Sequence, residues 1–300
     1  SPPPRRNTIS GEEIDAVVAT MKSGVLSQFL GTWSPDFMGG PRVRAFEAQA
    51  AEYFNVRHAL TVNSWTSGLV AAVGAIGIEP GDEVIVTPFT MAASATAILH
   101  WNAIPVFADI HPETFCIDPV ATERLVTPNT RAIMAVDIFG LPSASDELMA
   151  IAEEYDLKVI TDSAQAPGAK NRGRFAGTLT HIGGFSLNYH KHIHAGEGGI
   201  VVTNDDELAE NVALIRNHAE AVVGPMGKTD LTNMLGHNFR MGEIEASIAS
   251  EQLKKLDGVV ITRQELAARL ASQLGLLPGL SIPEVPEGLT HAYYVFAIVV

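Results

Sequence analysis

Residues 157–169 read LKVITDSAQAPGA, which is among the most informative stretches of the chain. The apolar run before Asp162 predicts a buried β-strand that ends in a carboxylate. An unpaired charge would be expensive in such a place, so Asp162 needs a cationic partner, and a structural arginine is the ordinary one. A second unusual stretch, GGFSLNYHKHIHAGEGG (183–199), contains Lys191.

Apolar strands alternate with helical patterns on both sides of this stretch. Strands are predicted at 58–64, 82–88, 104–110, 131–140, 157–163, 183–189 and 198–205, and helices at 10–24, 42–54, 66–78, 91–102, 143–156, 206–220, 242–259 and 264–277. Such alternation is typical of an α/β protein with a mostly parallel sheet covered by helices on both faces. Ligands of such sheets bind beyond the carboxyl ends of the strands.

Composition narrows the class of protein. The 300 residues are 46% hydrophobic and 18% charged, as in an ordinary globular protein, and the net charge of −14 argues against nucleic acid and anionic membranes as partners. The single cysteine, Cys116, excludes an intrachain disulfide and suits a reducing compartment. Neither a membrane-length apolar run nor a secretory signal is recognisable, so we expect a cytoplasmic enzyme. The β-prone run 293–300 predicts a strand at the last residue, as in an incomplete sequence.

Two segments that follow predicted strands offer groups for a phosphate and for a flat ring. NSWTSG (63–68) puts Thr66 and Ser67 at a helix N-terminus, where backbone N–H groups and hydroxyls can hold a phosphate. Simple capping of that helix explains the same pattern. In TPFTMAAS (87–94), Phe89 or Met91 can cover the face of a ring, although apolar residues after strands are usually core.

The Lys191 and Asp162 segments together suggest a pyridoxal phosphate (PLP) enzyme. Such an enzyme needs a lysine that forms a Schiff base and an acid that protonates the pyridine nitrogen. Lys191 and Asp162 are the candidates, and burial or nearby cations would lower the pKa of the lysine. Gln165 can reach the phenolic oxygen of the same ring, and Ser186 can donate to the phosphate.

The three histidines around Lys191 have a rival interpretation. If His190, His192 and His194 lay on a strand, their spacing would point all three to one face and suggest a metal site. No second cluster of acidic or thiol ligands accompanies them. We therefore favour imine chemistry and expect no metal.

Taken together, the segments resemble a known family. Between about Gly39 and Leu256 the chain is similar to the DegT/DnrJ/EryC1/StrS aminotransferases, the sugar-nucleotide branch of the fold-type I PLP enzymes. The stretches that carry the resemblance are FMGGPRVRAFE, GDEVIVTPFT, IPVFADI, TPNTRAIMAVDIFG, DSAQAPGA, FSLNYHKHIHAGEGGIVVTND, IRNHAE and GHNFRMGEIEASI. Their combination and order are specific, whereas each alone is not.

The resemblance implies a fold and a set of roles. The fold would be a mostly parallel seven-stranded sheet flanked by helices, with an N-terminal arm (1–25), a large PLP-binding domain (26–245) and the start of a smaller C-terminal α+β domain (246–300). Lys191 would be the Schiff-base and proton-transfer lysine, Asp162 would hold the pyridinium, and Gln165 would contact the ring oxygen. The ring-stacking position would be Met91, and the phosphate would be held by Thr66, Ser67, Ser186 and, from a neighbouring subunit, Asn238. A homodimer with shared active sites follows.

The chain departs from the family pattern at three positions. Trp65 stands where a glycine is common, and its bulk should reshape the pocket wall. Met91 replaces a commonly aromatic residue, and Asp137 replaces a common histidine at a strand end. Positive groups for an anionic substrate are available at Arg42, Arg216, Lys228 and Arg240.

The expected reaction is transfer of an amino group from glutamate or glutamine to a keto-sugar nucleotide. Four alternatives stay open at this point. They are PLP-dependent sugar dehydration, in which a histidine replaces the lysine, amination of a keto-cyclitol, a PLP-binding regulatory protein without turnover, and a metal hydrolase built on the histidine cluster.

Overall fold

The computed structural model describes residues 8–32, 34–219, 224, 227 and 234–300. Within them, seven strands form one sheet in the order β1-β9-β8-β5-β4-β2-β3. These are β1 (His58–Val62), β2 (Glu83–Val86), β3 (Ile104–Phe107), β4 (Thr130–Val136), β5 (Lys158–Asp162), β8 (Ile182–Ser186) and β9 (Gly199–Thr203). Strand β9 runs antiparallel to both neighbours and the other pairs are parallel, so the expected mostly parallel sheet is confirmed.

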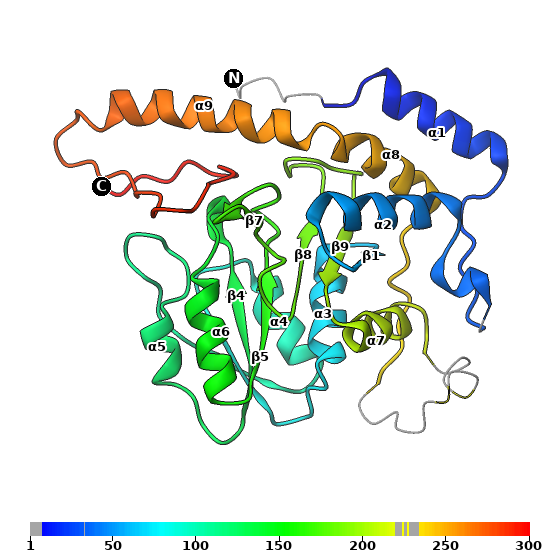
Figure 1. Cartoon of the computed structure of the whole chain (residues 1–300), viewed down its shortest axis with the longest axis horizontal. Coiled ribbons are helices and arrows are strands. Elements are labelled where there is room, and N and C mark those ends of the chain that lie inside the picture. The colour runs from blue at the N-terminus through cyan, green and yellow to red at the C-terminus, as the bar shows by residue number, and fades with distance from the viewer. Residues whose placement is uncertain (1–7, 33, 220–223, 225–226, 228–233) are drawn as a thin grey trace.

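Helices cover both faces of this sheet (Figure 1). One face packs against α3 (Trp65–Ala75), α4 (Ala92–His100) and α7 (Asp206–Arg216). On the other face, α2 (Pro41–Phe54) and α6 (Ser145–Glu154) pack against the sheet, while α8 (Glu243–Leu253) packs against α2 and α5 (Pro119–Glu123) against α6. The remaining helices are α1 (Gly11–Ser23), η1 (Pro35–Met38), η2 (Ile138–Gly140) and α9 (Leu256–Leu274). Among the described residues, no helix is both long and apolar enough to cross a membrane.

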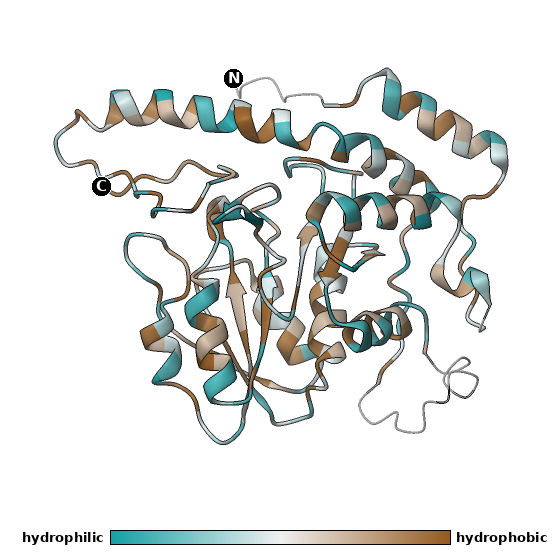
Figure 2. Ribbon diagram, in the orientation of Figure 1, coloured by the Kyte–Doolittle hydropathy of each residue, from teal (hydrophilic) through white to brown (hydrophobic). Residues whose placement is uncertain are grey.

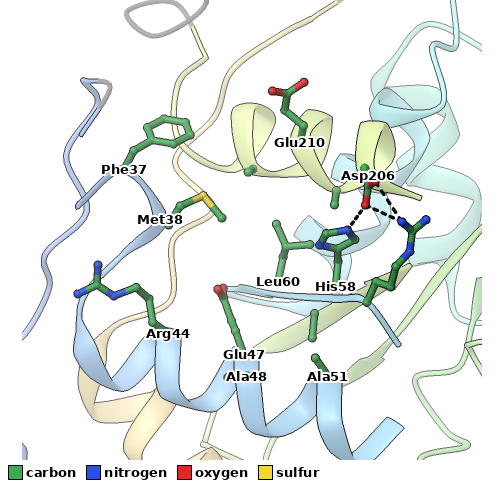
Figure 3. A pocket seen from close by; sticks show the side chains of 14 residues that line it. Phe37, Met38, Arg44, Glu47, Ala48, Ala51, His58, Leu60, Asp206 and Glu210 are labelled. Atoms are coloured by element: carbon green, nitrogen blue, oxygen red, sulfur yellow. Dashed lines mark hydrogen bonds and ion pairs between the residues drawn. The ribbon is translucent and has the colours of Figure 1, made fainter. Parts of the chain in front are cut away.

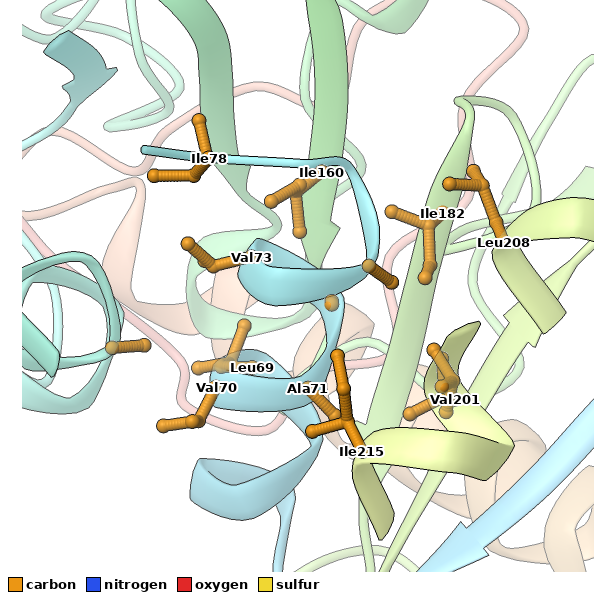
Figure 4. Close-up of a cluster of buried hydrophobic side chains, with 14 of the residues drawn as sticks. Leu69, Val70, Ala71, Val73, Ile78, Ile160, Ile182, Val201, Leu208 and Ile215 are labelled. Carbon is orange, nitrogen blue, oxygen red and sulfur yellow. The ribbon is translucent and has the colours of Figure 1, made fainter. Parts of the chain in front are cut away.

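The main core lies between α3 and the sheet. Leu69 and Val70 of α3 meet Ile160 of β5, Ile182 of β8 and Ile215 of α7 (Figure 4). Burying each such side chain contributes about 1.5–3 kcal/mol. These core contacts hold the start of α3 against the strand ends. Along the outer helices, such as α6 and α9, hydrophilic residues interleave with apolar ones (Figure 2).

The structure differs from the predicted elements in several places. The helix predicted over 242–259 is divided into α8 and α9. The predicted strand at 293–300 is absent from these described residues, where Val299 makes only an isolated bridge with Ser281. Helix α5 and a short hairpin of β6 (Lys170–Asn171) with β7 (Arg174–Phe175) were not predicted.

The N-terminal helix α1 is tied to α8 and α9 by a buried acid. The predicted capping box of Ser10 and Glu13 is present, and the Glu13 side chain is 1% exposed. Its carboxylate accepts hydrogen bonds from the Lys255 ammonium (2.6 Å) and the Gln252 amide (2.8 Å). Burial alone would raise the pKa of Glu13, but these bonds and those from Ser10 outweigh it and lower the pKa to about 2.

This network predicts an acid-sensitive contribution to stability. A carboxyl whose pKa is depressed by folding stabilises the protein above its unfolded pKa, and the contribution is lost as the pH falls towards about 2. Glu13→Gln should lower the free energy of unfolding at pH 7 by about 1.5–3 kcal/mol, because it replaces charge-assisted hydrogen bonds by neutral ones. Thermal melting of both proteins between pH 7 and 2.5 checks this. A difference that stays constant over that range would contradict it.

Candidate active site

The parallel strands bring several of the predicted residues to one edge of the sheet. Asp162 ends β5 and Ser186 ends β8, while Asn63 directly follows β1 and Asp137 directly follows β4. These strands run in the same direction, so their carboxyl ends share an edge. Helix α9 and the chain after it lie beyond that edge (Figure 1).

The carboxylate of Asp162 is buried and held by donors from three segments. Its Oδ1 accepts the indole N–H of Trp65 (2.7 Å) and the backbone N–H of Ala164 (3.1 Å). Its Oδ2 accepts the hydroxyl of Ser94 in α4 (2.8 Å). The side chain is therefore fixed in the interior with both oxygens engaged, and the residue as a whole is 6% exposed.

The ring of Trp65 is buried against the sheet instead of facing solvent. The residue is 5% exposed and belongs to the core between α3 and the sheet. Its ring turns inward because glycines at positions 68 and 184 leave room for it: a Cβ on Gly184 would lie 2.2 Å from the ring. The bulk of the Trp65 ring is therefore accommodated in the core, next to the Asp162 carboxylate.

Lys191 lies near Asp162 in a half-buried position. Burial lowers the pKa of Lys191 from its ordinary value, and the negative charge of Asp162 opposes that shift. The ammonium lies 4.5 Å from the centre of the Tyr294 ring, a cation–π contact with the C-terminal segment. The structure thus brings the predicted lysine and acid within electrostatic reach of each other.

The three histidines around Lys191 do not share a face. Residues 189–193 form turns and bends, and residue 194 is not in a strand either. His192 is buried with Nε2 2.8 Å from the carbonyl oxygen of Ala292, while Nε2 of His194 lies 3.0 Å from the Thr8 hydroxyl. Across the described part of the chain, no group of three or more histidine, cysteine or acidic residues could hold a metal ion. His192 and His194 therefore contact different parts of the chain in the described structure.

The predicted phosphate cradle surrounds the start of α3. Ser64 caps the helix: its Oγ accepts the backbone N–H of Ser67 (3.1 Å) and lies 2.9 Å from the Ser67 hydroxyl. Thr66 is exposed on the first turn. Ser186 is buried at the end of β8, where its hydroxyl accepts the backbone N–H of Asn188 (3.3 Å). Capping and phosphate binding are compatible here, because the first N–H groups of a helix have no intrahelical acceptors.

The remaining predicted site residues are Gln165, Met91 and Asn238. Gln165 accepts the backbone N–H of Phe139 through Oε1 (2.6 Å), which leaves its NH2 end as the donor. Met91 is 68% exposed at the start of α4, three residues before Ser94. The exposed Asn238 lies beside Asn63 of the same chain, whose side-chain amide donates to its carbonyl oxygen (3.4 Å).

Asp137, at the position where a histidine is common, is a second buried acid. Burial raises its pKa to about 6, despite hydrogen bonds from the Ser163 hydroxyl and from the backbone and hydroxyl of Ser143. The charge of Asp162 adds to the upward shift of the pKa. The two neighbouring strand ends therefore carry carboxyl groups in different environments.

The candidate cationic groups divide between core and surface. Arg216 is fully buried and paired with Glu47 (2.6 Å), which makes it a structural residue. Arg240 donates to the Asn217 side chain (2.9 Å), Arg42 is exposed on α2, and Lys228 lies outside the described residues. A buried ion pair of this kind neutralises itself, so Arg216 adds no local positive charge for a substrate.

A hollow of about 500 Å³ lies away from this cluster, between α2, β1 and α7 (Figure 3). Its polar lining includes His58, whose Nε2 is 2.7 Å from the Asp206 carboxylate, and Arg57, which pairs with the same acid (3.0 Å). His58 begins β1, whereas Asn63 follows its end. The hollow therefore lies at the opposite end of β1 from Asp162 and Lys191, and it shares no residue with them.

The residues at the carboxyl edge fit PLP in their chemistry. They supply an amine of lowered pKa, a buried carboxylate, and a helix N-terminus with hydroxyls. A bound PLP would be held by Asp162, by Lys191 and by the start of α3. A fold and a site of this kind define a PLP-dependent aminotransferase of fold type I.

Comparisons with known proteins place the chain within that class. The family model of the DegT/DnrJ/EryC1/StrS aminotransferases matches residues 7–300, and the chain belongs to this family of PLP-dependent enzymes. The spore coat polysaccharide biosynthesis protein SpsC of Bacillus subtilis is 34% identical over 97% of this chain and 73% of that protein. The L-glutamine:2-deoxy-scyllo-inosose aminotransferase of Streptomyces fradiae is 37% identical over 89% of this chain and 65% of its own length.

Solved structures of related enzymes have the same fold as this chain. The crystal structure of S. venezuelae DesV in complex with a ketimine intermediate has a TM-score of 0.86 at 33% identity, covering 96% of this chain and 73% of that one. The structure of 3-amino-5-hydroxybenzoic acid synthase has the same TM-score at 30% identity, covering 97% of this chain and 73% of that one. The predicted fold class, family and cofactor are confirmed.

Sequence reasoning missed three contacts of the cluster. Ser94 reaches Asp162 from the first turn of α4, and Trp65 bonds the same carboxylate from below. Tyr294 lies against Lys191 although more than a hundred residues separate them along the chain. Ser94 and Trp65 stand in segments predicted to contribute to the site, but their bonds to Asp162 were not predicted, and no local pattern points to Tyr294.

One signal in the sequence could have placed the tryptophan. Gly68 gives no hint by itself, because a single glycine in a helix has many explanations. The pair Gly183–Gly184 in β8 is more informative. Glycines inside a strand often mark the close approach of another group, and the group that approaches Gly184 is the indole ring of Trp65.

The electrostatics of Lys191 can be tested in the protein without cofactor. Its amine should react with an amine-specific ester at a lower pH than the exposed Lys22 of α1, because burial lowers its pKa. Asp162→Asn should lower the labelling midpoint further, since it removes the charge that raises this pKa. Peptide mass spectrometry across pH 6–11 measures both residues in one sample, with pH limits that bracket roughly the ordinary lysine pKa. A higher midpoint in the variant would refute the assignment.

Proposed function

We propose that the protein transfers an amino group from glutamate or glutamine to a keto-sugar linked to a nucleotide. The observation that carries this proposal is the buried carboxylate of Asp162 at the carboxyl edge of the sheet, whose charge acts on the half-buried Lys191. Relatives support the substrate class: GDP-perosamine synthase of Caulobacter vibrioides is 34% identical, and the dTDP-3-amino-3,4,6-trideoxy-alpha-D-glucose transaminase of Streptomyces venezuelae is 35% identical. A keto-cyclitol is the second candidate acceptor, supported by the 37% identity to the S. fradiae enzyme.

Each residue has a part in the proposed chemistry. PLP, when bound, supplies a carbonyl for the lysine and a ring that withdraws electrons. Lys191 attaches the cofactor and afterwards moves a proton as an amine, a role that its lowered pKa favours. Asp162 keeps the ring nitrogen protonated, and Gln165 donates to the phenolic oxygen. Met91 covers one face of the ring.

The phosphate would be bound by Thr66, Ser67 and Ser186, with Asn238 contributed by a neighbouring subunit. This arrangement makes the protein a homodimer with shared active sites. We place it in the cytoplasm, a reducing compartment that suits the free, buried thiol of Cys116.

We further propose the domain division at residues 25 and 245, with residues 246–300 forming the start of a second domain. The contact of Tyr294 with Lys191 supports a role of that second part in closing the site.

The geometry also bears on sugar dehydration, the other PLP reaction of the family. That reaction would need a histidine where Lys191 stands. His192 is buried, and its Nε2 lies against the carbonyl oxygen of Ala292. The charge of Asp162 acts instead on the Lys191 ammonium. Transamination is therefore the better supported reaction.

The proposal is tested by absorption spectroscopy. PLP added to the purified protein should give a yellow band that glutamate or glutamine abolishes, and borohydride should fix the cofactor to the peptide that contains Lys191. Lys191→Ala should lose both properties. Lys170→Ala is the matched control, because the Lys170 ammonium also lies 4.5 Å from an aromatic ring, that of Phe175. If Lys191→Ala behaves as wild type, the proposed function is wrong.

The acceptor is identified in a second step. The protein loaded with the amino form of the cofactor should regain its yellow band when a suitable ketone is added. A panel of nucleotide-linked keto-sugars and keto-cyclitols would then separate the two acceptor classes. Return of the band with a cyclitol alone would contradict the nucleotide-sugar assignment.

A further inference from the structure

Trp65 and Asp162 form a buried pair, and the proposed reaction assigns no role to Trp65. The indole Nε1 donates to Oδ1 of Asp162 at 2.7 Å, and the two residues are 5% and 6% exposed. A hydrogen bond to a charged acceptor is among the stronger ones in proteins, and it gains strength in a medium of low dielectric constant. The bond therefore connects the core residue Trp65 directly to a residue of the candidate active site.

The space for the indole ring is built into three separate segments. A Cβ on Gly68, one turn along α3, would lie 2.6 Å from the ring. A Cβ on Gly184 of β8 would lie 2.2 Å from it, and a Cβ on Gly199 of β9 would lie 2.8 Å from the backbone of Trp65. A smaller residue at position 65 would leave this space empty, whereas a larger one at 68 or 184 would expel the ring. The surroundings thus accommodate one orientation of the tryptophan.

The orientation of the carboxylate follows from these contacts. The terminal torsion of an aspartate is broad, so an unrestrained carboxylate samples many orientations. Here Trp65 and Ala164 hold Oδ1, and Ser94 holds Oδ2. The nearby ammonium of Lys191 competes for the same negative charge. A carboxylate fixed by the indole cannot turn freely towards that ammonium.

We propose that Trp65 is a positioning residue, which through its N–H holds Asp162 ready to receive the protonated ring nitrogen of the cofactor. This inference rests on the proposed function, since it assigns a role to Trp65 only if PLP binds at Asp162. Ser94 supports the same carboxylate from its other oxygen. The pair is a preorganised acceptor, which lowers the cost of ordering the site when the cofactor binds.

The test uses a substitution that removes the N–H together with part of the ring, so a control for packing is needed. Trp65→Phe keeps an aromatic ring in the cavity, and we expect the dissociation constant of PLP to rise about fivefold, because the Asp162 carboxylate must then be ordered when the cofactor binds. Trp101→Phe is the matched control. Trp101 is also buried (3% exposed) and packs against α3, but its N–H donates to the carbonyl oxygen of Val70.

A cofactor analogue separates positioning from packing. 1-Deazapyridoxal phosphate carries a carbon in place of the ring nitrogen, so it cannot use Asp162. Trp65→Phe should therefore weaken PLP binding and leave the affinity for the analogue within about twofold, a change no larger than that of an ordinary neutral substitution. Equal weakening of both ligands would mean that Trp65 acts by packing alone and would overturn the inference.

The remaining outcomes are also decisive. If wild-type protein binds PLP at Lys191 and Trp65→Phe binds it equally well, the inference fails while the proposed function stands. If wild-type protein does not bind PLP at Lys191, both fall. Should Trp65→Phe prove too unstable by thermal melting, Ser94→Ala removes the donor to Oδ2 with little change of shape. It must then show the same loss for PLP without loss for the analogue, or the preorganised acceptor is refuted.

Discussion

The buried carboxylate of Asp162 is the constraint on which the rest of the site depends. A charge at the end of a buried strand is tolerated only where hydrogen bonds and an opposite charge surround it. The donors come from α3 through Trp65, from α4 through Ser94 and from the following turn, and Lys191 supplies the opposite charge. The starts of two helices and the Lys191 loop are therefore positioned around one acid. The group that would hold the cofactor is also one that organises the fold.

The Lys191 loop is fixed by parts of the chain that lie far from it in sequence. His192 meets the carbonyl oxygen of Ala292, and His194 meets the Thr8 hydroxyl, which itself donates to Gln252 of α8. Histidines that in sequence suggest metal ligands thus serve as contacts to both ends of the described chain. Because Lys191 directly precedes His192 on this loop, its position depends on the N-terminal segment, on α8 and on the C-terminal segment together. A lysine on a loop can be placed accurately only when such contacts restrain it.

Much of this arrangement can be predicted from the sequence, and the exceptions have physical reasons. The apolar strands and the charged residues at their ends follow from local patterns, so the sheet and the pairing of Asp162 with Lys191 were foreseeable. The direction of Trp65 was not, because a side chain on the first turn of α3 can point to the pocket or to the core. The choice depends on space left by Gly184, more than a hundred residues away along the chain. The run 293–300 has strand-forming residues, but a strand needs a partner, and in the described structure it finds only a bridge to Ser281.

The two acids at neighbouring strand ends show how environment separates their roles. Asp137 and Asp162 are both buried, and the carboxyl groups of such a pair repel each other when both are charged. Burial raises the pKa of Asp137 to about 6, so its carboxyl takes up a proton in a range where carboxyl groups are ordinarily charged. As the pH falls through that range, the repulsion on Asp162 disappears while the indole, hydroxyl and backbone donors remain in place. Asp162 remains the acid whose negative charge acts on Lys191. An acid in place of the common histidine is therefore compatible with the proposed cofactor site.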